Sequence, residues 1–136
     1  MLKQFQNPLA LAARVLIALL FLPEGIGKIR DFSGTAGYIA LAGLPLPELG
    51  VVLAIVAEVG GSLALLVGFQ ARWVALVMAI FTVATGFFFH RFWTVPTDQA
   101  MLEHIMFFKN MAIAGGLLMM VAFGAGSWSL DARRKD

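Results

Sequence analysis

The chain has 136 residues, of which 60% are hydrophobic and only 13% are charged, whereas soluble domains average about 45–50% apolar and about 25% charged residues. Its formal net charge is +2, and the basic residues gather at the ends of apolar segments instead of forming the broad basic face that nucleic-acid binding requires. There is no cysteine, which excludes disulfides, thiolate chemistry and cysteine-held metal or iron–sulfur sites. We therefore predict an all-α integral membrane protein without a nucleic-acid partner.

Four apolar segments are long enough to cross a bilayer, whose hydrocarbon core needs about 20 mainly apolar residues per helix. No A-x-A type of cleavage site follows the first segment, so we expect it to stay as a helix that Pro23 kinks or ends. No stretch remains for a soluble domain, and we expect one transmembrane domain, residues 1–136, folded as a four-helix bundle. The expected spans are 9–28, 49–69, 73–90 and 105–127.

The segment between the first two spans carries no charge after Asp31 but contains three glycines and two prolines. Asp31 or Ser33 is expected to cap a helix that runs to Ala42, and Gly43 is expected to stop it. A helix of about ten residues is too short to span a bilayer at 1.5 Å per residue. We therefore expect it to lie along the membrane surface or to cover the mouth of the bundle.

The orientation follows from the lysines and arginines in the short connections, which are more frequent on the cytoplasmic side. With both termini in the cytoplasm, five such residues lie inside and three outside. We therefore expect a multi-pass protein of the bacterial cytoplasmic (inner) membrane with both termini cytoplasmic. The inner residues are Lys3, Arg72, Arg133, Arg134 and Lys135, and the outer ones are Lys28, Arg30 and Arg91.

Glu58 lies near the middle of the second predicted span. Because an ionised carboxylate at that depth costs about 2.5 kcal/mol or more on insertion scales, it should face the bundle interior and have a partner. Arg14 is offset from it by about 7 Å along the bundle, which a long side chain can bridge. Asn110 and Lys109 are the other expected neighbours of Glu58.

Further polar residues are expected at or near membrane depth. Glu24 and Lys109 should both lie about one turn below the outer surface, where they could pair, although Glu24 could instead form an i, i+4 surface pair with Lys28. Thr82, Gly86 and His90 recur at four-residue spacing on one stripe of the third span, which can face the same interior. Together these residues predict a polar pocket open to the outer side, or else ion pairs that only fix the register of the helices.

Two histidines, His90 and His104, follow the third span and begin the fourth. They could ligate a metal or haem, but an interfacial histidine pair without a metal is the preferred interpretation. We therefore predict no metal and no haem.

Several motifs follow one another along the chain: Arg14, Phe21-x-x-Glu24-x-x-Gly27-Lys28, Glu58-x-Gly60-Gly61 with Gly68 after it, Lys109-Asn110, Gly115-Gly116 and Gly126-x-x-Ser129-x-Asp131. In their order and spacing the chain resembles the DoxX family of small four-helix membrane proteins. That resemblance implies a link to thiosulfate:quinone oxidoreduction, to membrane-associated oxidoreductase complexes and to resistance against oxidative or thiol stress. It also marks Glu24, Lys28, Glu58, Lys109 and Asn110 as candidate site residues.

The first functional hypothesis is a quinone-reactive subunit of a membrane oxidoreductase, because a quinone needs an apolar slot, a donor at each carbonyl and a titratable group. Such a subunit would need a partner protein, or would form a homo-oligomer, within the lipid bilayer. The alternatives are a non-enzymatic scaffold or assembly factor and a small-molecule or proton-coupled transporter. The candidate catalytic residues are Glu58 and Lys109, and the candidate binding residues are Arg14, Glu24, Lys28, His90 and Asn110.

Overall fold

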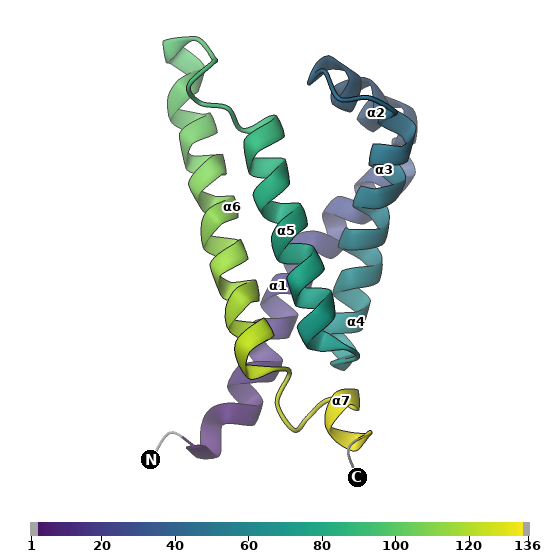
Figure 1. Ribbon diagram of the computed structural model, residues 1–136, viewed down its shortest axis with the longest axis vertical. Helices are drawn as coiled ribbons and strands as arrows, with labels where there is room; N and C mark the ends of the chain where they lie inside the picture. The colour runs from purple at the N-terminus through teal and green to yellow at the C-terminus, as the bar shows by residue number, and fades with distance from the viewer. Residues whose placement is uncertain (1–2, 135–136) are drawn as a thin grey trace.

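The computed structural model describes residues 3–134, and the elements within them are all helical (Figure 1). Four helical stretches are long and apolar enough to cross a membrane, which confirms the fold class. They are α1 (Gln6–Arg30), a second stretch that joins α3 (Pro47–Ile55), η2 (Val56–Gly60) and α4 (Gly61–Val67), then α5 (Ala71–Phe89) and α6 (Thr97–Phe123). The short helices are η1 (Lys3–Phe5), α2 (Phe32–Leu41) and α7 (Leu130–Arg133).

Each span differs from its expected bounds by a few residues, and α6 differs most. α1 continues through Pro23 to Arg30, so the proline does not end it. A proline inside a transmembrane helix is tolerated where neighbouring groups satisfy the freed carbonyl. α6 begins at Thr97 instead of residue 105 and ends at Phe123 instead of residue 127. Its first turns contain Asp98, Gln99, Glu103 and His104, so a span predicted from an apolar window leaves them out.

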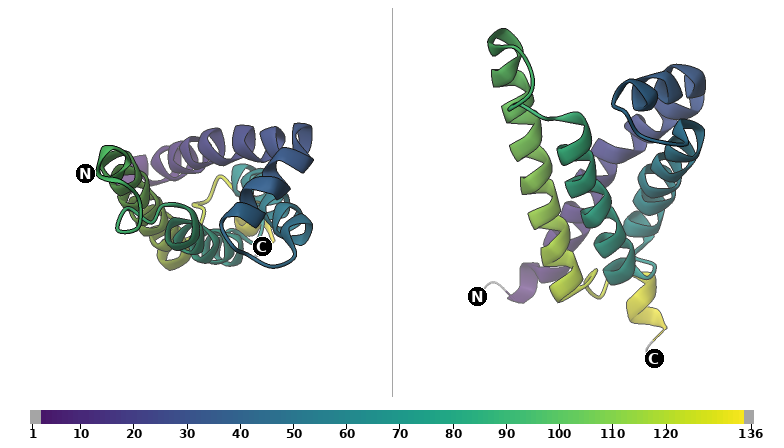
Figure 2. Two further views of the ribbon diagram at one scale, coloured as in Figure 1. Left: turned by 90° about the horizontal axis from the view of Figure 1, so that it is seen from above. Right: turned by 45° about the horizontal axis from the view of Figure 1, so that its top comes forward.

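The helices form two halves that diverge toward one end (Figures 1 and 2). α1, α2, α3 and α4 make one half, and the antiparallel pair of α5 and α6 makes the other. We call the end that carries η1 and α7 the terminal end, and the opposite end the α2 end. The main buried core uses small side chains, including Ala71, Ala75, Ala79 and Ala114, which let helices approach closely.

Both η1 and α7 lie at the terminal end, as an even number of spans requires (Figure 1). Which side of the membrane that end faces remains a prediction from the basic residues. Lys135, one of those basic residues, lies outside the described residues.

The predicted short helix is confirmed as α2. The side chain of Asp31 caps it by accepting a hydrogen bond from the backbone N–H of Gly34 at 3.0 Å, and Gly43, with φ of +79°, follows its end. Ile39 of α2 is buried against Val51 of α3. The helix therefore covers the α2 end of its half of the bundle.

The second span contains a π-helical turn, η2, with Glu58 at its centre. Such turns are rare and occur frequently at functional sites. α1 passes very close to η2 at Gly25: a Cβ atom added there would lie 2.6 Å from Cγ2 of Val59 and 3.0 Å from Cβ of Glu58. The glycine thus permits the close approach that brings the last turns of α1 to Glu58.

Candidate functional site

A cavity of about 490 Å³ lies between the two halves and extends from η2 to the α2 end. Most of its wall is apolar, with Phe21, Leu53, Phe81 and Ile113 among the lining residues. Six of the seven candidate site residues line it, namely Glu24, Lys28, Glu58, His90, Lys109 and Asn110. These six residues therefore share one cavity, whereas Arg14 lies outside it.

Glu58 points into the bundle interior, as predicted, but its partner is Lys28. The Nζ atom of Lys28 lies 2.8 Å from Oε2 of Glu58, and the two side chains are 23% and 7% exposed. The predicted partners Arg14, Lys109 and Asn110 were wrong. Apart from this ion pair, Oε2 has no hydrogen-bond partner among the described residues.

The direction of helical side chains explains the pairing of Lys28 with Glu58. Side chains lean toward the N-terminus of their own helix. α1 begins at the terminal end, so Lys28 leans from the α2 end down toward the middle of the bundle. The second span runs the opposite way, so Glu58 leans up toward Lys28.

The same rule sends Arg14 away from Glu58, toward the terminal end. Its guanidinium donates to the backbone oxygens of Leu66 at 2.8 Å, Leu65 at 3.3 Å and Trp128 at 2.6 Å. The carbonyls of the last turn of α4 lack the full set of helical partners and carry the negative end of the helix dipole. Arg14, which is 1% exposed, therefore ties α1 and α4 to the C-terminal segment.

The predicted pair of Glu24 and Lys109 does not form. The Nζ atom of Lys109 lies 3.2 Å from the sulfur of Met106, and no carboxylate of residues 3–134 lies within 4.0 Å of it. Glu24 is 68% exposed and lies 4.0 Å from Lys28, at the limit of the i, i+4 pair that was the alternative. The two residues line the same cavity from different halves of the bundle. They do not pair, because the halves have diverged at this height.

Asn110 is buried and joins α6 to α5 within the cavity wall. Its amide nitrogen donates to the backbone oxygen of Thr82 at 3.3 Å and to Oγ1 of Thr85 at 3.2 Å. Thr82 is buried as expected, but Gly86, from the same stripe, faces α6 instead of the cavity. The amide of Asn110 is thus held in a fixed orientation at the side of the cavity.

His90 has an acidic partner that the sequence did not reveal. Its Nδ1 lies 2.9 Å from Oε2 of Glu103, in the first turns of α6. His104 packs instead on the rings of Phe92 and Phe108, at 4.9 and 4.7 Å between ring centroids. The two histidines therefore do not form a pair.

Tyr38 of α2 was missed by the sequence analysis because nothing marked the short helix as part of a site. It lines the cavity and stacks on Phe89 at 5.3 Å. Burial raises the pKa of Tyr38, and the negative charge of Glu103 raises it further. The phenol is therefore a protonated hydrogen-bond donor at the α2 end of the cavity.

Comparison with known proteins places the chain in a family. A family model described as DoxX matches residues 9–91, from within α1 to just past α5. The chain is 38% identical to the inner membrane protein YqjF of Escherichia coli strain K12, over 96% of this chain and 95% of that protein. It is 35% identical to the inner membrane protein YphA of the same organism, over 92% of this chain and 89% of that protein.

A more distant relative is the Surfeit locus protein 4 homolog of Drosophila melanogaster, 29% identical over 82% of this chain and 44% of that protein. No solved structure matches the chain. The family model covers more than half of the chain, and the two bacterial relatives also cover α6, which carries Lys109 and Asn110. The chain therefore belongs to the DoxX family of membrane proteins.

Proposed function

We propose that the protein is a quinone-binding subunit of an oxidoreductase in the cytoplasmic membrane, with the quinone ring in the cavity beside Glu58. One observation carries this proposal: the buried Lys28–Glu58 ion pair and Asn110 line a single cavity of about 490 Å³ whose wall is otherwise mainly apolar. Ligand pockets usually have volumes of about 300–1,000 Å³ and few polar groups. A quinone, with two ring carbonyls and a prenyl tail, has a matching distribution of polar and apolar surface.

The polar residues have separate roles in this proposal. Lys28, from α1, is the hydrogen-bond donor for a ring carbonyl. Asn110, from α6, uses both amide hydrogens on Thr82 and Thr85, so its Oδ1 accepts a hydrogen bond from a hydroxyl of the quinol. Glu58 exchanges a proton with the bound ring, because it is a buried carboxylate that lines the cavity. The pair of His90 and Glu103 connects the cavity with water at the α2 end. Lys28 thus takes the place beside Glu58 that the sequence suggested for Lys109.

The proposal also requires a partner protein. Reduction of a quinone to a quinol consumes two electrons and two protons. The chain has no cysteine for an iron–sulfur cluster or a redox disulfide, so the electrons are supplied by another protein that docks on this one. Arg14 has no role in the reaction, because it contacts only the terminal end of the bundle.

Labelling with a photoreactive quinone tests the proposal. The purified chain in lipid nanodiscs is illuminated with an azidoquinone, and the labelled peptides are identified by mass spectrometry. Competition with ubiquinone and menaquinone analogues gives the affinity. Label on the cavity-facing parts of α1, η2 and α6 is expected, whereas label only on lipid-facing residues, or no competition, would refute the proposal.

Three variants show which residues the quinone needs. Asn110→Ala removes this neutral hydrogen-bonding group without changing the charge, and we expect about tenfold weaker binding of the quinol form, within the range for a lost hydrogen bond. Glu58→Gln should leave binding measurable but abolish the redox activity of the complex. Asp98→Asn is the control for Glu58→Gln, because it also replaces a carboxyl group by an amide. Asp98 is an exposed residue of α6 outside the cavity, so this variant should behave like wild type.

A scaffold function is the second candidate. The Lys28–Glu58 ion pair also favours this function, because the pair joins α1 to the second span. The double variant Lys28→Glu with Glu58→Lys separates the two. It keeps one positive and one negative charge in contact but moves the carboxylate to α1. A scaffold should regain its stability and its function in this variant, whereas a quinone site should regain stability alone.

A further inference from the structure

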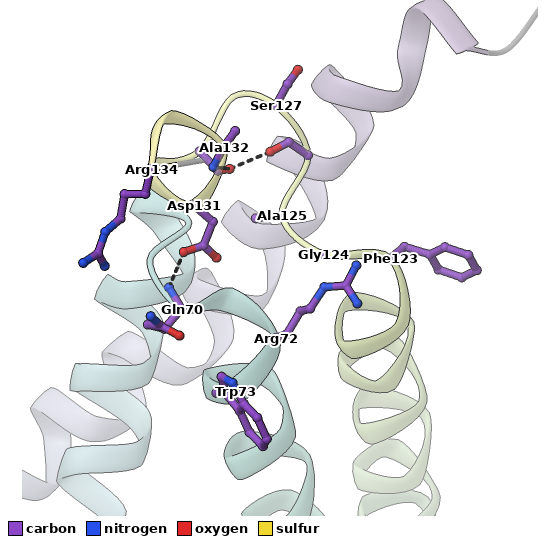
Figure 3. Close-up of a pocket in the computed structure, with 12 residues that line it drawn as sticks. Gln70, Arg72, Trp73, Phe123, Gly124, Ala125, Ser127, Asp131, Ala132 and Arg134 are labelled. Atoms are coloured by element: carbon purple, nitrogen blue, oxygen red, sulfur yellow. Dashed lines mark hydrogen bonds between the residues drawn. The ribbon is translucent and has the colours of Figure 1, made fainter. Parts of the chain in front are cut away.

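A second cavity, of about 630 Å³, lies at the terminal end, away from the proposed quinone site (Figure 3). The turn between α4 and α5, the end of α6 and the C-terminal segment that leads into α7 form its wall. The lining residues include Arg72, Trp73, Phe123, Asp131 and Arg134. This cavity opens where the four spans end.

Hydrogen bonds to α1 hold the C-terminal segment in place, so this cavity is a fixed part of the fold. Arg14 binds the backbone oxygen of Trp128 from inside the bundle. The side chain of Asn7 in α1 accepts a hydrogen bond from the N–H of Ser127 at 2.9 Å. Gly124 and Gly126 take φ values of +81° and +78°, which favour glycine, and turn the chain back across the helix ends.

The charge of this cavity is positive. Asp131 lines it, but its two carboxylate oxygens accept the N–H groups of Gln70 at 2.7 Å and Ala71 at 2.8 Å, at the start of α5. The positive end of the helix dipole therefore balances that carboxylate. Arg72 makes no ion pair with any of residues 3–134. Arg134 is positioned by the ring of Phe69, 5.3 Å from its guanidinium carbon.

The rim of the cavity has the composition of a membrane interface. Trp73 and Phe123 are exposed next to the arginines, and aromatic side chains are enriched at the level of the lipid headgroups. In Figure 3, Arg72 points toward Gly124 at the end of α6, whereas Arg134 extends from α7 on the other side of Asp131. Two cations from different elements thus flank the cavity beside apolar surface.

We propose that this cavity binds the phosphate-bearing headgroup of an anionic phospholipid. Arg72 and Arg134 supply the positive charge for the phosphate, and the acyl chains pass along Trp73 and Phe123 into the bilayer. Anionic lipids attract basic residues near the membrane surface, and the aromatic rim favours a lipid over a free phosphate ion. Bound lipid would join the C-terminal segment to the ends of α5 and α6.

Native mass spectrometry of the full-length protein tests this site. The protein is titrated with phosphatidylglycerol, with phosphatidylcholine, and with inorganic phosphate as a competitor. We expect preferential binding of phosphatidylglycerol, and about fivefold weaker binding by each of the variants Arg72→Gln and Arg134→Gln. Arg134→Lys keeps the positive charge, so this variant should bind the lipid nearly as tightly as wild type. Arg91→Gln, at the α2 end, is the matched control and should bind like wild type.

Three results would overturn the proposal. Equal affinity for phosphatidylcholine would show that charge is not recognised. Equal weakening by Arg91→Gln would show that the lipid binds through the overall charge of the protein. Displacement of the lipid by inorganic phosphate at a comparable concentration would assign the site to free phosphate. Circular dichroism of each variant checks that the helices are intact.

Discussion

Lys28→Met should destabilise the protein strongly, because it removes the cation from the Nζ to Oε2 contact of 2.8 Å and leaves Glu58 buried. Breaking a fully buried ion pair costs about 3–5 kcal/mol. Because Lys28 is 23% exposed, we expect the lower end of that range, about 3 kcal/mol. Glu58→Gln should cost less, about 1 kcal/mol, because the long side chain of Lys28 can move its charge toward water.

The assay is unfolding in mixed detergent micelles with increasing sodium dodecyl sulfate, followed by circular dichroism. Combining Lys28→Met with Glu58→Gln removes both charges, so the double variant should be more stable than Lys28→Met alone. Lys109→Met is the matched control, because Lys109 is exposed and has no carboxylate within 4.0 Å among residues 3–134; it should change the free energy of unfolding by less than about 0.5 kcal/mol. Additive effects of the two single variants, or an equal loss in Lys109→Met, would refute the assignment of Lys28 as the partner.

Three other predictions concern the packing of the helices and the orientation of the protein in the membrane. Arg14→Met should lower the free energy of unfolding by about 2–4 kcal/mol, since several backbone acceptors lose a charged donor, and a melting temperature equal to that of wild type would contradict this. Gly25→Ala should cost about 1–3 kcal/mol through overpacking against η2, whereas Gly27→Ala, with nothing within 4 Å of the added Cβ, should be harmless in the same thermal melt. In the cysteine-free chain, an impermeant thiol reagent added to intact cells should label Thr97→Cys but not Ser127→Cys if the terminal end is cytoplasmic; the reverse pattern would invert the topology.

The missed partner of Glu58 could have been found from the sequence. The number of spans already implied that α1 and the second span are antiparallel. Applying the lean of helical side chains toward the N-terminus would then have favoured Lys28 over Arg14. The prediction of Arg14 rested only on the depths of the Cα atoms in the membrane, which do not show where a long side chain ends.

Other features had no sequence signal of their own. A π-helical turn around Glu58 adds a residue to one turn of a helix, and the apolar pattern on either side is unchanged by it. The contact of His90 with Glu103 depends on α6 starting at Thr97, in polar residues that an apolar span does not include. The terminal cavity requires the C-terminal segment to fold back, which only long-range contacts such as Asn7 to Ser127 reveal.

The sequence by itself determined that this chain is an all-helical membrane protein with four spans and a short capped helix between the first two. It also predicted that the polar residues at membrane depth gather in one pocket, with ion pairs that only fix the helix register as the alternative. These properties follow from the length and composition of each segment and from the cost of an unpaired charge in an apolar medium. The tertiary structure alone decided which charges pair, because pairing depends on the tilt, rotation and separation of whole helices. Close packing, such as that of Gly25 against η2, sets those quantities.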